Sequence, residues 1–215
     1  MNAASSPSPA YALAIFDFDG TLADSFPFFL RLHNELARKH GFREVAPQDV
    51  PALRAMSTRE LMARSGLPAW RLPVVARDFT RRMQEADEVR LFDGAGEALH
   101  ALASAGLRLA LVTSNSRPNI DRVLGPELCA LFGHIDCGAS IFGKRSRLLR
   151  AARVLGTKPE ACIYVGDATA DAEAAREAGM DFGAVDWGYT TPEALALMRP
   201  ARRFGQVREL LSLAG

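Results

Sequence analysis

The chain has 215 residues, of which 48% are hydrophobic and 24% are charged, a globular composition with room for one full core and a smaller unit. Its 26 basic and 25 acidic residues leave a formal net charge of +1, so it lacks the basic field of a nucleic-acid binder. Cys129, Cys137 and Cys162 lack the close pairs of a zinc site or a disulfide framework. No apolar run approaches the roughly 20 residues that span a bilayer, and residues 1–9 do not resemble a signal peptide. We expect a cytoplasmic protein without nucleic-acid or membrane partners, and a disordered tail over residues 1–10.

Short apolar runs alternate with helical patterns along most of the chain. Strands are predicted at 13–16, 107–113, 161–165 and 182–187, with a weaker candidate at 135–139. Helices that end at a glycine are predicted at 95–105, 145–155 and 170–178. This alternation predicts an α/β fold with a Rossmann-like, doubly wound parallel sheet. Ligands of such sheets bind at the carboxyl ends of the strands, so the polar residues there are candidate site residues.

The strand patterns disappear between residues 26 and 90. Phe29, Leu32 and Leu36 recur at helical spacing, the capping box Ser57-Thr58-Arg59-Glu60 predicts the start of another helix, and 72–83 is amphipathic. At roughly 65 residues the segment is too long for an ordinary crossover. We therefore predict a small α-helical cap domain over 26–90, inserted into a core made of residues 11–25 and 91–215.

Two aspartates, Asp17 and Asp19, directly follow the first predicted strand. Residues i and i+2 of an extended segment point the same way, so both carboxylates can face one site, and Gly20 permits a tight turn after them. One carboxylate could stay ionised as a nucleophile and metal ligand, while the other carries a proton if its surroundings raise its pKa. An acidic turn after a strand is also a common structural feature.

A second acidic pair, Asp167 and Asp171, follows the strand predicted at 161–165. Mg²⁺ prefers oxygen ligands, usually one or two carboxylates completed by water and substrate phosphate. Alternatively, one of these aspartates caps the helix that begins near Thr169. Since both acidic pairs follow strands at the same edge of the sheet, together they indicate a metal site.

Other polar residues at predicted strand ends suit a phosphate. Thr113, Ser114 and Asn115 end the strand at 107–113, where a hydroxyl and backbone N–H groups could hold phosphate oxygens. The alternative is an ordinary polar turn. Lys144 could offset the charge of a nucleophile and a phosphoryl group, although most lysines are solvated surface residues.

These residues, in this order, resemble the markers of the haloacid dehalogenase (HAD) superfamily. The likeness rests on Asp17-Phe18-Asp19-Gly20-Thr21-Leu22, then Thr113, Lys144, and Gly166-Asp167 with Asp171, and it spans nearly the whole chain. It is greatest to the phosphatase branch with a helical cap after the first strand, as in phosphoglycolate phosphatase-like enzymes. The resemblance implies a HAD-like fold and a Mg²⁺-dependent phosphatase whose partner is a small phosphorylated metabolite, phosphoglycolate-like or a sugar phosphate.

The resemblance also implies roles for these residues. Asp17 would attack phosphorus to form an aspartyl-phosphate, and Asp19 would protonate the leaving oxygen and then activate water. Thr113 would hold phosphoryl oxygens and Lys144 would balance charge. Mg²⁺ would be bound by Asp17, the backbone carbonyl of Asp19 and Asp167, with support from Asp171.

Substrate contacts are expected at the strand end and from the cap. The first set is Ser114 and Asn115, and the second is Arg54, Ser57 and Arg59, which lie where such caps reach into the site. An arginine on a helix can equally be solvated or cover apolar surface.

Several alternatives stay open. A phosphomutase of the β-phosphoglucomutase type shares all four markers, and a phosphonate-cleaving enzyme would need a cap lysine, for which Lys39 is the one candidate. A dehalogenase is disfavoured because Asp19 is present. A non-catalytic binding module would be favoured by loss of Asp17 or Asp19, and both are present. We expect a monomer.

Overall fold

The computed structural model describes residues 11–56, 58–84, 87–138 and 143–215. In these residues the strands form one parallel sheet with the order β3-β2-β1-β4-β5-β6. Their bounds are β1 (Leu13–Phe16), β2 (Arg108–Val112), β3 (Phe132–Asp136), β4 (Cys162–Gly166), β5 (Asp181–Val185) and β6 (Arg202–Phe204). Strand β1 lies in the middle, paired with β2 on one side and β4 on the other. The carboxyl ends of β1, β2 and β4 therefore lie side by side.

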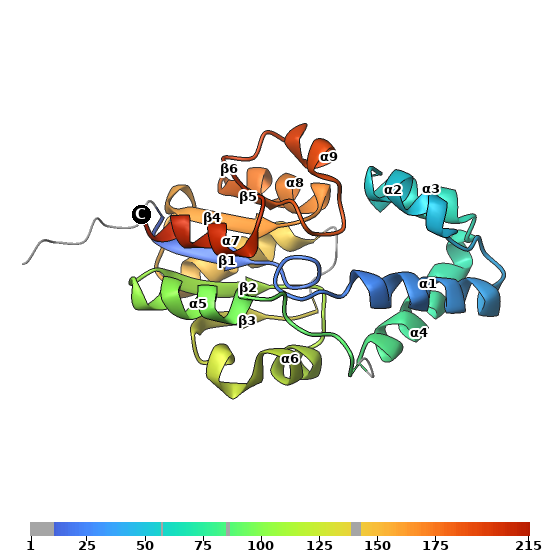
Figure 1. Ribbon diagram of the computed structural model, residues 1–215, viewed down its shortest axis with the longest axis horizontal. Coiled ribbons are helices and arrows are strands. Elements are labelled where there is room, and N and C mark those ends of the chain that lie inside the picture. Colours follow the sequence, from blue (N-terminus) through green and yellow to red (C-terminus); the bar gives the residue numbers. More distant parts are fainter. Residues whose placement is uncertain (1–10, 57, 85–86, 139–142) are drawn as a thin grey trace, which may run out of the picture.

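Helices cover both faces of the sheet (Figure 1). Because successive strand residues point to opposite faces, Ala14 and Phe16 pack in one core and Leu13 and Ile15 in the other. The first core is closed by α5 (Ala95–Ser104), α6 (Arg117–Cys129) and the 3-10 helix η4 (Val207–Ala214), and the second by α7 (Lys144–Val154), α8 (Thr169–Ala178) and α9 (Pro192–Ala196). A further 3-10 turn, η3 (Pro159–Ala161), precedes β4. The predicted doubly wound α/β fold is confirmed.

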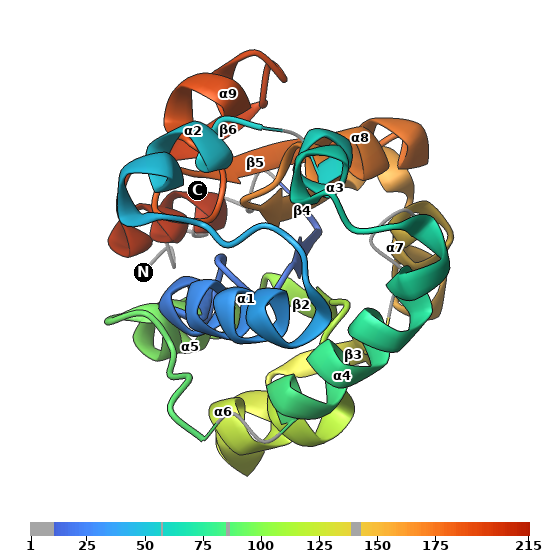
Figure 2. The same ribbon diagram turned by 90° about the vertical axis from the view of Figure 1, so that its right-hand side faces the viewer.

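Between β1 and β2 the described residues form helices, which we call the helical insert. These are α1 (Phe26–His40), η1 (Pro47–Asp49), α2 (Val50–Arg54), α3 (Thr58–Ser65), η2 (Ala69–Arg71) and α4 (Leu72–Gln84). Leu32 and Leu36 of α1 pack with Val75 and Met83 of α4 in a small core of their own. The insert lies beyond the carboxyl ends of the strands (Figure 1), and α1, α3 and α4 stand in front of the sheet when it is viewed from that end (Figure 2).

Among the elements that differ from the sequence predictions, three have a clear reason in the sequence. Strand β3 begins at Phe132, earlier than expected, because Gly133 and His134 interrupt the apolar pattern. Strand β6 is a short edge strand whose Arg202 and Arg203 are exposed, so it carries no apolar run. Helix α6 contains Gly125 and Pro126 at a kink, a pair that is typical of turns in sequence. Among the described residues, no helix has the length and apolar character needed to cross a membrane.

Candidate active site

Asp17 extends strand β1 by one residue, and the chain then turns sharply. Its backbone N–H donates to Val165 O at 2.9 Å, as in the β1–β4 ladder. The carbonyl oxygen of Phe18 accepts the N–H groups of Thr21, Leu22 and Ala23, which closes the turn. Gly20 has φ +75°, and a Cβ there would lie 2.4 Å from Asp167 Oδ2. The glycine is thus needed both for the turn and for the close approach of Asp167.

Lys144, the first residue of α7, lies between two carboxylates. Its Nζ donates to Asp17 Oδ2 at 2.8 Å and to Asp171 Oδ1 at 2.7 Å, and its side chain is only 6% exposed. It also donates to Tyr164 Oη at 3.0 Å. Burial alone would lower the pKa of Lys144, but the charges of Asp17 and Asp171 raise it well above its usual value. Lys144 is therefore a buried cation, rather than a solvated surface residue.

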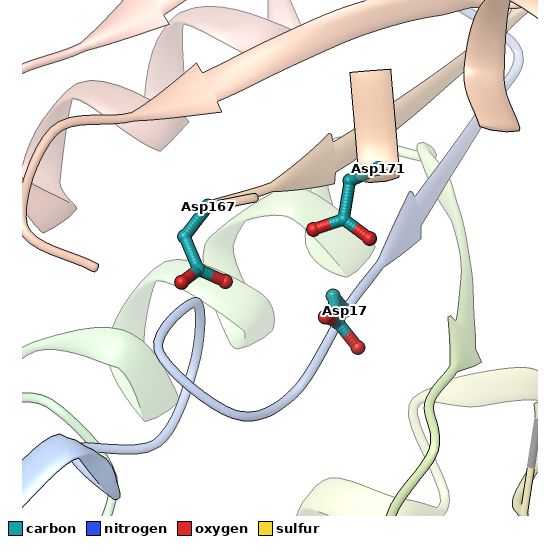
Figure 3. Close-up of side chains that lie close together, drawn as sticks. All are labelled: Asp17, Asp167 and Asp171. Carbon is teal, nitrogen blue, oxygen red and sulfur yellow. The ribbon is translucent and has the colours of Figure 1, made fainter. Parts of the chain in front are cut away.

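Three carboxylates, from Asp17, Asp167 and Asp171, point into one space at the end of β1 and β4 (Figure 3). Each has an oxygen within 4.8 Å of an oxygen of the others, and all three residues are buried. Burial raises the pKa of Asp17 to about 7, with Lys144 opposing the rise and Asp171 adding to it. Burial, together with the charges of Asp171 and Asp17, raises the pKa of Asp167 well above its usual value. A cluster with this excess of negative charge fits a divalent cation.

Asp167 is held by one hydrogen bond on each oxygen. Thr21 Oγ1 donates to Oδ1 at 2.9 Å and Tyr189 N donates to Oδ2 at 2.7 Å. Gly188 lies so close that a Cβ on it would be 2.1 Å from Asp167 Cβ. Each carboxylate oxygen keeps a second lone pair for another partner.

Asp171 has partners on both oxygens already. Oδ1 accepts from Lys144 and, at 3.1 Å, from Tyr164 Oη. Oδ2 accepts the N–H of Ala168 at 3.1 Å, which satisfies a free donor at the start of α8. Asp171 therefore caps α8, as the alternative interpretation of this acidic pair proposes, and it also belongs to the carboxylate cluster.

Asp19 is not part of this cluster and bonds to the segment after β2. Its Oδ2 accepts from Asn115 Nδ2 at 2.9 Å, while its Oδ1 is buried and has no hydrogen-bond partner among the described residues. Burial raises the pKa of Asp19, and the nearby Ser25 hydroxyl and Asn115 amide partly counter that rise. A carboxyl group with one unused oxygen and a raised pKa suits proton transfer.

The polar segment after β2 forms a compact turn. Thr113 is buried, its N–H donates to Asp136 O at 3.0 Å, and its Oγ1 accepts the N–H of Asn115 at 3.0 Å. Ser114 is exposed, whereas Asn115 is buried and bridges to Asp19. The structure thus brings Thr113 and Asn115 to the same strand edge as the aspartates.

The insert residues expected to contact substrate have different positions. Arg54 binds the backbone carbonyls of Gly188 and Tyr189 in the core. Ser57 lies outside the described residues, and Arg59 lies in α3 with a side chain that is not described. Lys39 pairs with Asp78 at 2.6 Å and is 56% exposed, which does not suit a buried amine nucleophile.

A pocket of about 170 Å³ lies between the insert and the start of α8. Aromatic rings from both parts line it, including Phe26, Phe29 and Tyr189, together with Leu53 and Thr169. The ring centroids of Phe26 and Tyr189 are 4.9 Å apart, edge to face. None of the clustered aspartates lines this pocket. Tyr189 does line it, and its N–H bonds to Asp167, so the pocket adjoins the carboxylate site through Tyr189.

Sequence analysis missed two tyrosines at this site. Tyr164 lies within an otherwise aliphatic strand, where a buried hydroxyl must find a partner, and it bonds to the Lys144–Asp171 pair. Tyr189 follows the strand predicted at 182–187, and ligands of parallel sheets bind at such strand ends, so its position in the sequence was a signal for a site residue. Its hydroxyl bonds to that of Ser25 at 2.9 Å, and its N–H bonds to Asp167.

Comparison with known proteins shows the family to which the chain belongs. The family model described as haloacid dehalogenase-like hydrolase matches residues 14–185. A phosphoglycolate phosphatase from Synechococcus elongatus is 36% identical over 188 residues, covering 86% of this chain and 89% of that protein. The tyrosine-protein kinase PtkA of Mycobacterium tuberculosis is 33% identical over 199 residues, covering 86% of this chain and 66% of that protein. A haloacid dehalogenase-like hydrolase from Streptococcus pneumoniae has the same fold, with a TM-score of 0.80 at 21% identity over 94% of this chain and 98% of that one. The chain belongs to the haloacid dehalogenase-like hydrolases.

Proposed function

We propose that this protein is a Mg²⁺-dependent phosphatase that hydrolyses a small phosphate monoester, phosphoglycolate-like or a sugar phosphate, through a phosphoryl group carried on Asp17. One observation carries the proposal: Asp17 ends the central strand with one oxygen on Lys144, inside a buried cluster with Asp167 and Asp171. A relative that is 36% identical and is named phosphoglycolate phosphatase supports the same class of substrate.

The donor set fits a hard divalent cation. The cluster has three carboxylates, and one ammonium group pairs with two of them, so with all groups ionised two negative charges are uncompensated in a buried site. Asp17 and Asp167 are the direct ligands in our proposal, with the backbone carbonyl of Asp19. Asp171 supports them, because its oxygens are already engaged by Lys144, Tyr164 and Ala168. Bound there, Mg²⁺ would neutralise the phosphoryl oxygens and help to hold them in line for displacement.

In the first step Asp17 attacks phosphorus. An O–P bond forms to the carboxylate, the bond from phosphorus to the leaving oxygen breaks, and Asp19 gives its proton to that oxygen. The raised pKa of Asp19 lets it carry this proton. Lys144 holds the attacking carboxylate in place and offsets its charge.

In the second step Asp19, now ionised, takes a proton from a water molecule. The water oxygen attacks phosphorus, the O–P bond to Asp17 breaks, and inorganic phosphate leaves. The Thr113 Oγ1 already accepts one N–H, so its own proton is left to donate to a phosphoryl oxygen. Asn115 keeps Asp19 oriented through both steps.

We assign the insert the role of a cap formed by residues 26–90 over a core of 11–25 and 91–215. Its position beyond the strand ends (Figure 2) would cover the reacting groups and exclude water. Closure over the site would also select the leaving group.

The decisive test is hydrolysis of 4-nitrophenyl phosphate and a panel of small phosphate monoesters, with Mg²⁺ and with EDTA. Wild type should release phosphate only with the metal, and Asp17→Asn should lower kcat/KM by at least about a thousandfold. Asp186→Asn is the matched control, since Asp186 directly follows β5 at the same sheet edge but pairs with Arg203 instead of the cluster. Metal-independent hydrolysis, or equal losses in both variants, would refute the proposal.

The covalent step has its own readout. An acid quench during turnover of a ³²P-labelled substrate should leave label on wild type that hydroxylamine removes, as expected for an acyl phosphate. Asp17→Asn should retain none. Label that resists hydroxylamine would place the phosphoryl group on another residue.

A further inference from the structure

Arg54, the last residue of α2, ties the insert to the core loop after β5. Its Nε donates to Tyr189 O at 3.1 Å and its Nη2 donates to Gly188 O at 2.5 Å. Its own carbonyl oxygen accepts the N–H of Thr191 at 2.9 Å. The guanidinium carbon also lies 5.5 Å from the centroid of the Phe26 ring. The arginine that sequence analysis expects to contact substrate thus binds the core, and it also lines the pocket between the insert and the start of α8.

The loop that Arg54 binds is also the loop that holds Asp167. The carbonyl of Gly188 and the N–H of Tyr189 belong to one peptide group, and that N–H donates to Asp167 Oδ2 at 2.7 Å. In a trans peptide these two groups point in opposite directions, so the guanidinium, the peptide and the carboxylate form one continuous chain. A cation on the carbonyl oxygen polarises the peptide and strengthens the N–H as a donor.

This arrangement leaves little freedom for the carboxylate. Gly188 is in such close contact with Asp167 that no Cβ would fit between them, and Thr190 N donates to the Asp167 carbonyl at 3.3 Å. Movement of the 188–190 segment must therefore move Asp167. Among the described side chains of the insert, that of Arg54 binds the carbonyls of Gly188 and Tyr189 in this segment.

We propose that Arg54 is a positioning residue that couples docking of the insert on the core to the affinity of the Asp167 site for a divalent cation. The inference rests on the proposed function, because it needs Asp167 to be a metal ligand. When the insert is docked, Arg54 orients the Tyr189 N–H and fixes the carboxylate; when the insert moves away, that support is lost. By thermodynamic reciprocity, a bound cation favours the docked insert to the same extent.

A purely structural anchor would behave differently. Loss of such an anchor would lower the free energy of unfolding, or raise KM, without changing the metal affinity of the folded protein. Loss of a substrate-binding arginine would raise KM and would leave metal affinity in the absence of substrate unchanged. Cation affinity in the absence of substrate thus separates the three roles.

The experiment compares Arg54→Gln with Arg71→Gln in the full chain. Arg71 is the matched control because its guanidinium also donates to a backbone carbonyl, that of His40 at 2.8 Å, but within the insert. Isothermal titration with MgCl₂ in phosphate-free buffer should give a Kd about tenfold higher for Arg54→Gln than for wild type. Arg71→Gln should stay within about twofold of wild type, in the range of surface changes.

A second measurement needs neither metal nor activity. The amide proton of Tyr189 in ¹H–¹⁵N spectra should move upfield in Arg54→Gln, since its hydrogen bond to Asp167 weakens, and should not move in Arg71→Gln. If Arg54→Gln does not fold, Arg54→Lys, which keeps the charge but loses the fork, should show the same two changes at smaller size.

The outcomes separate the two hypotheses. Equal Mg²⁺ affinity in Arg54→Gln and Arg71→Gln overturns the inference, even if the enzyme is an active phosphatase. No Mg²⁺ binding by wild type overturns the proposed function and removes the basis of the inference. Weaker Mg²⁺ binding in Arg54→Gln with an unchanged Tyr189 amide proton shift also counts against the inference. The change in affinity would then not be transmitted through the peptide group between Gly188 and Tyr189.

Discussion

Lys144 Nζ lies within 2.8 Å of both Asp17 Oδ2 and Asp171 Oδ1, so one buried ammonium group joins carboxylates from two distant parts of the chain. Asp17 follows the first strand and Asp171 lies in α8. Buried charges are costly unless they are paired, and here each carboxylate is stabilised through the same cation.

Replacement of Lys144 by methionine should destabilise the protein and abolish activity. Two buried carboxylates would lose their counter-ion, at a cost of about 3 kcal/mol in the free energy of unfolding. Urea denaturation at pH 7.5 measures this change. Lys39→Met is the control, because Lys39 forms an exposed pair with Asp78 and should cost less than about 1 kcal/mol. Similar losses in both variants would contradict a special role for Lys144.

Asp19→Asn should affect leaving groups unequally. The variant has no proton to give, so release of a poorly stabilised alkoxide should slow by about 10²- to 10⁴-fold. Release of 4-nitrophenolate, which hardly needs a proton, should slow much less. The rate of alcohol release in the first turnover is the quantity to compare, since it excludes the second step. Equal losses for both substrates would argue against Asp19 as the general acid.

Gly188→Ala should disturb Asp167. Its added Cβ would lie 2.1 Å from Asp167 Cβ, so the loop must shift, at a cost of about 1–3 kcal/mol in stability, and Mg²⁺ affinity should fall. In Gly96→Ala the new Cβ meets Leu128 Cδ1 at an ordinary 3.5 Å, and α5 should gain helix propensity. Thermal melts and Mg²⁺ titration of both variants measure these changes. Equal losses of stability and of Mg²⁺ affinity in Gly96→Ala would contradict the prediction.

The insert should show its own acid sensitivity through Asp78. Hydrogen bonds from Lys39 and His40 lower the pKa of Asp78 from 3.8 to about 2. Because the folded-state pKa is the lower one, the stabilisation is complete above pH 3.8 and is lost as the pH falls towards 2. The stability difference between wild type and Asp78→Asn, followed by denaturation between pH 5 and 2, should therefore shrink with acid. A constant difference would show that the charge of Asp78 is not the cause.

Much of the fold could be predicted because the central strands are buried on both faces. Apart from Arg108 at the start of β2, strands β1, β2 and β4 consist of buried residues and are followed directly by polar ones, a pattern with few other interpretations. The edges of the sheet could not be predicted so well. Strand β6 has two exposed arginines, and its pairing with β5 comes from backbone hydrogen bonds that leave no mark on the sequence.

For the candidate site, too, some positions could be predicted from the sequence and others could not. Asp17 and Asp167 follow predicted strands, so parallel topology alone predicts that they approach each other. The position of Lys144 could be expected from family order, but its burial could not, since it depends on how α7 packs against α8. Arg54 shows the limit most clearly: its partners are main-chain carbonyls in a loop far along the chain, and any sequence can supply a carbonyl.

The central place of β1 also bears on how the protein is made. This strand precedes the other strands of the sheet in the chain, yet it is flanked by β2 and β4, and the carboxylates beside Asp17 come from residues 167 and 171. On the ribosome the three carboxylates therefore cannot come together until residue 171 has emerged. If the proposed Mg²⁺ site is correct, the cation stabilises the folded domain by mass action and does not stabilise shorter nascent fragments.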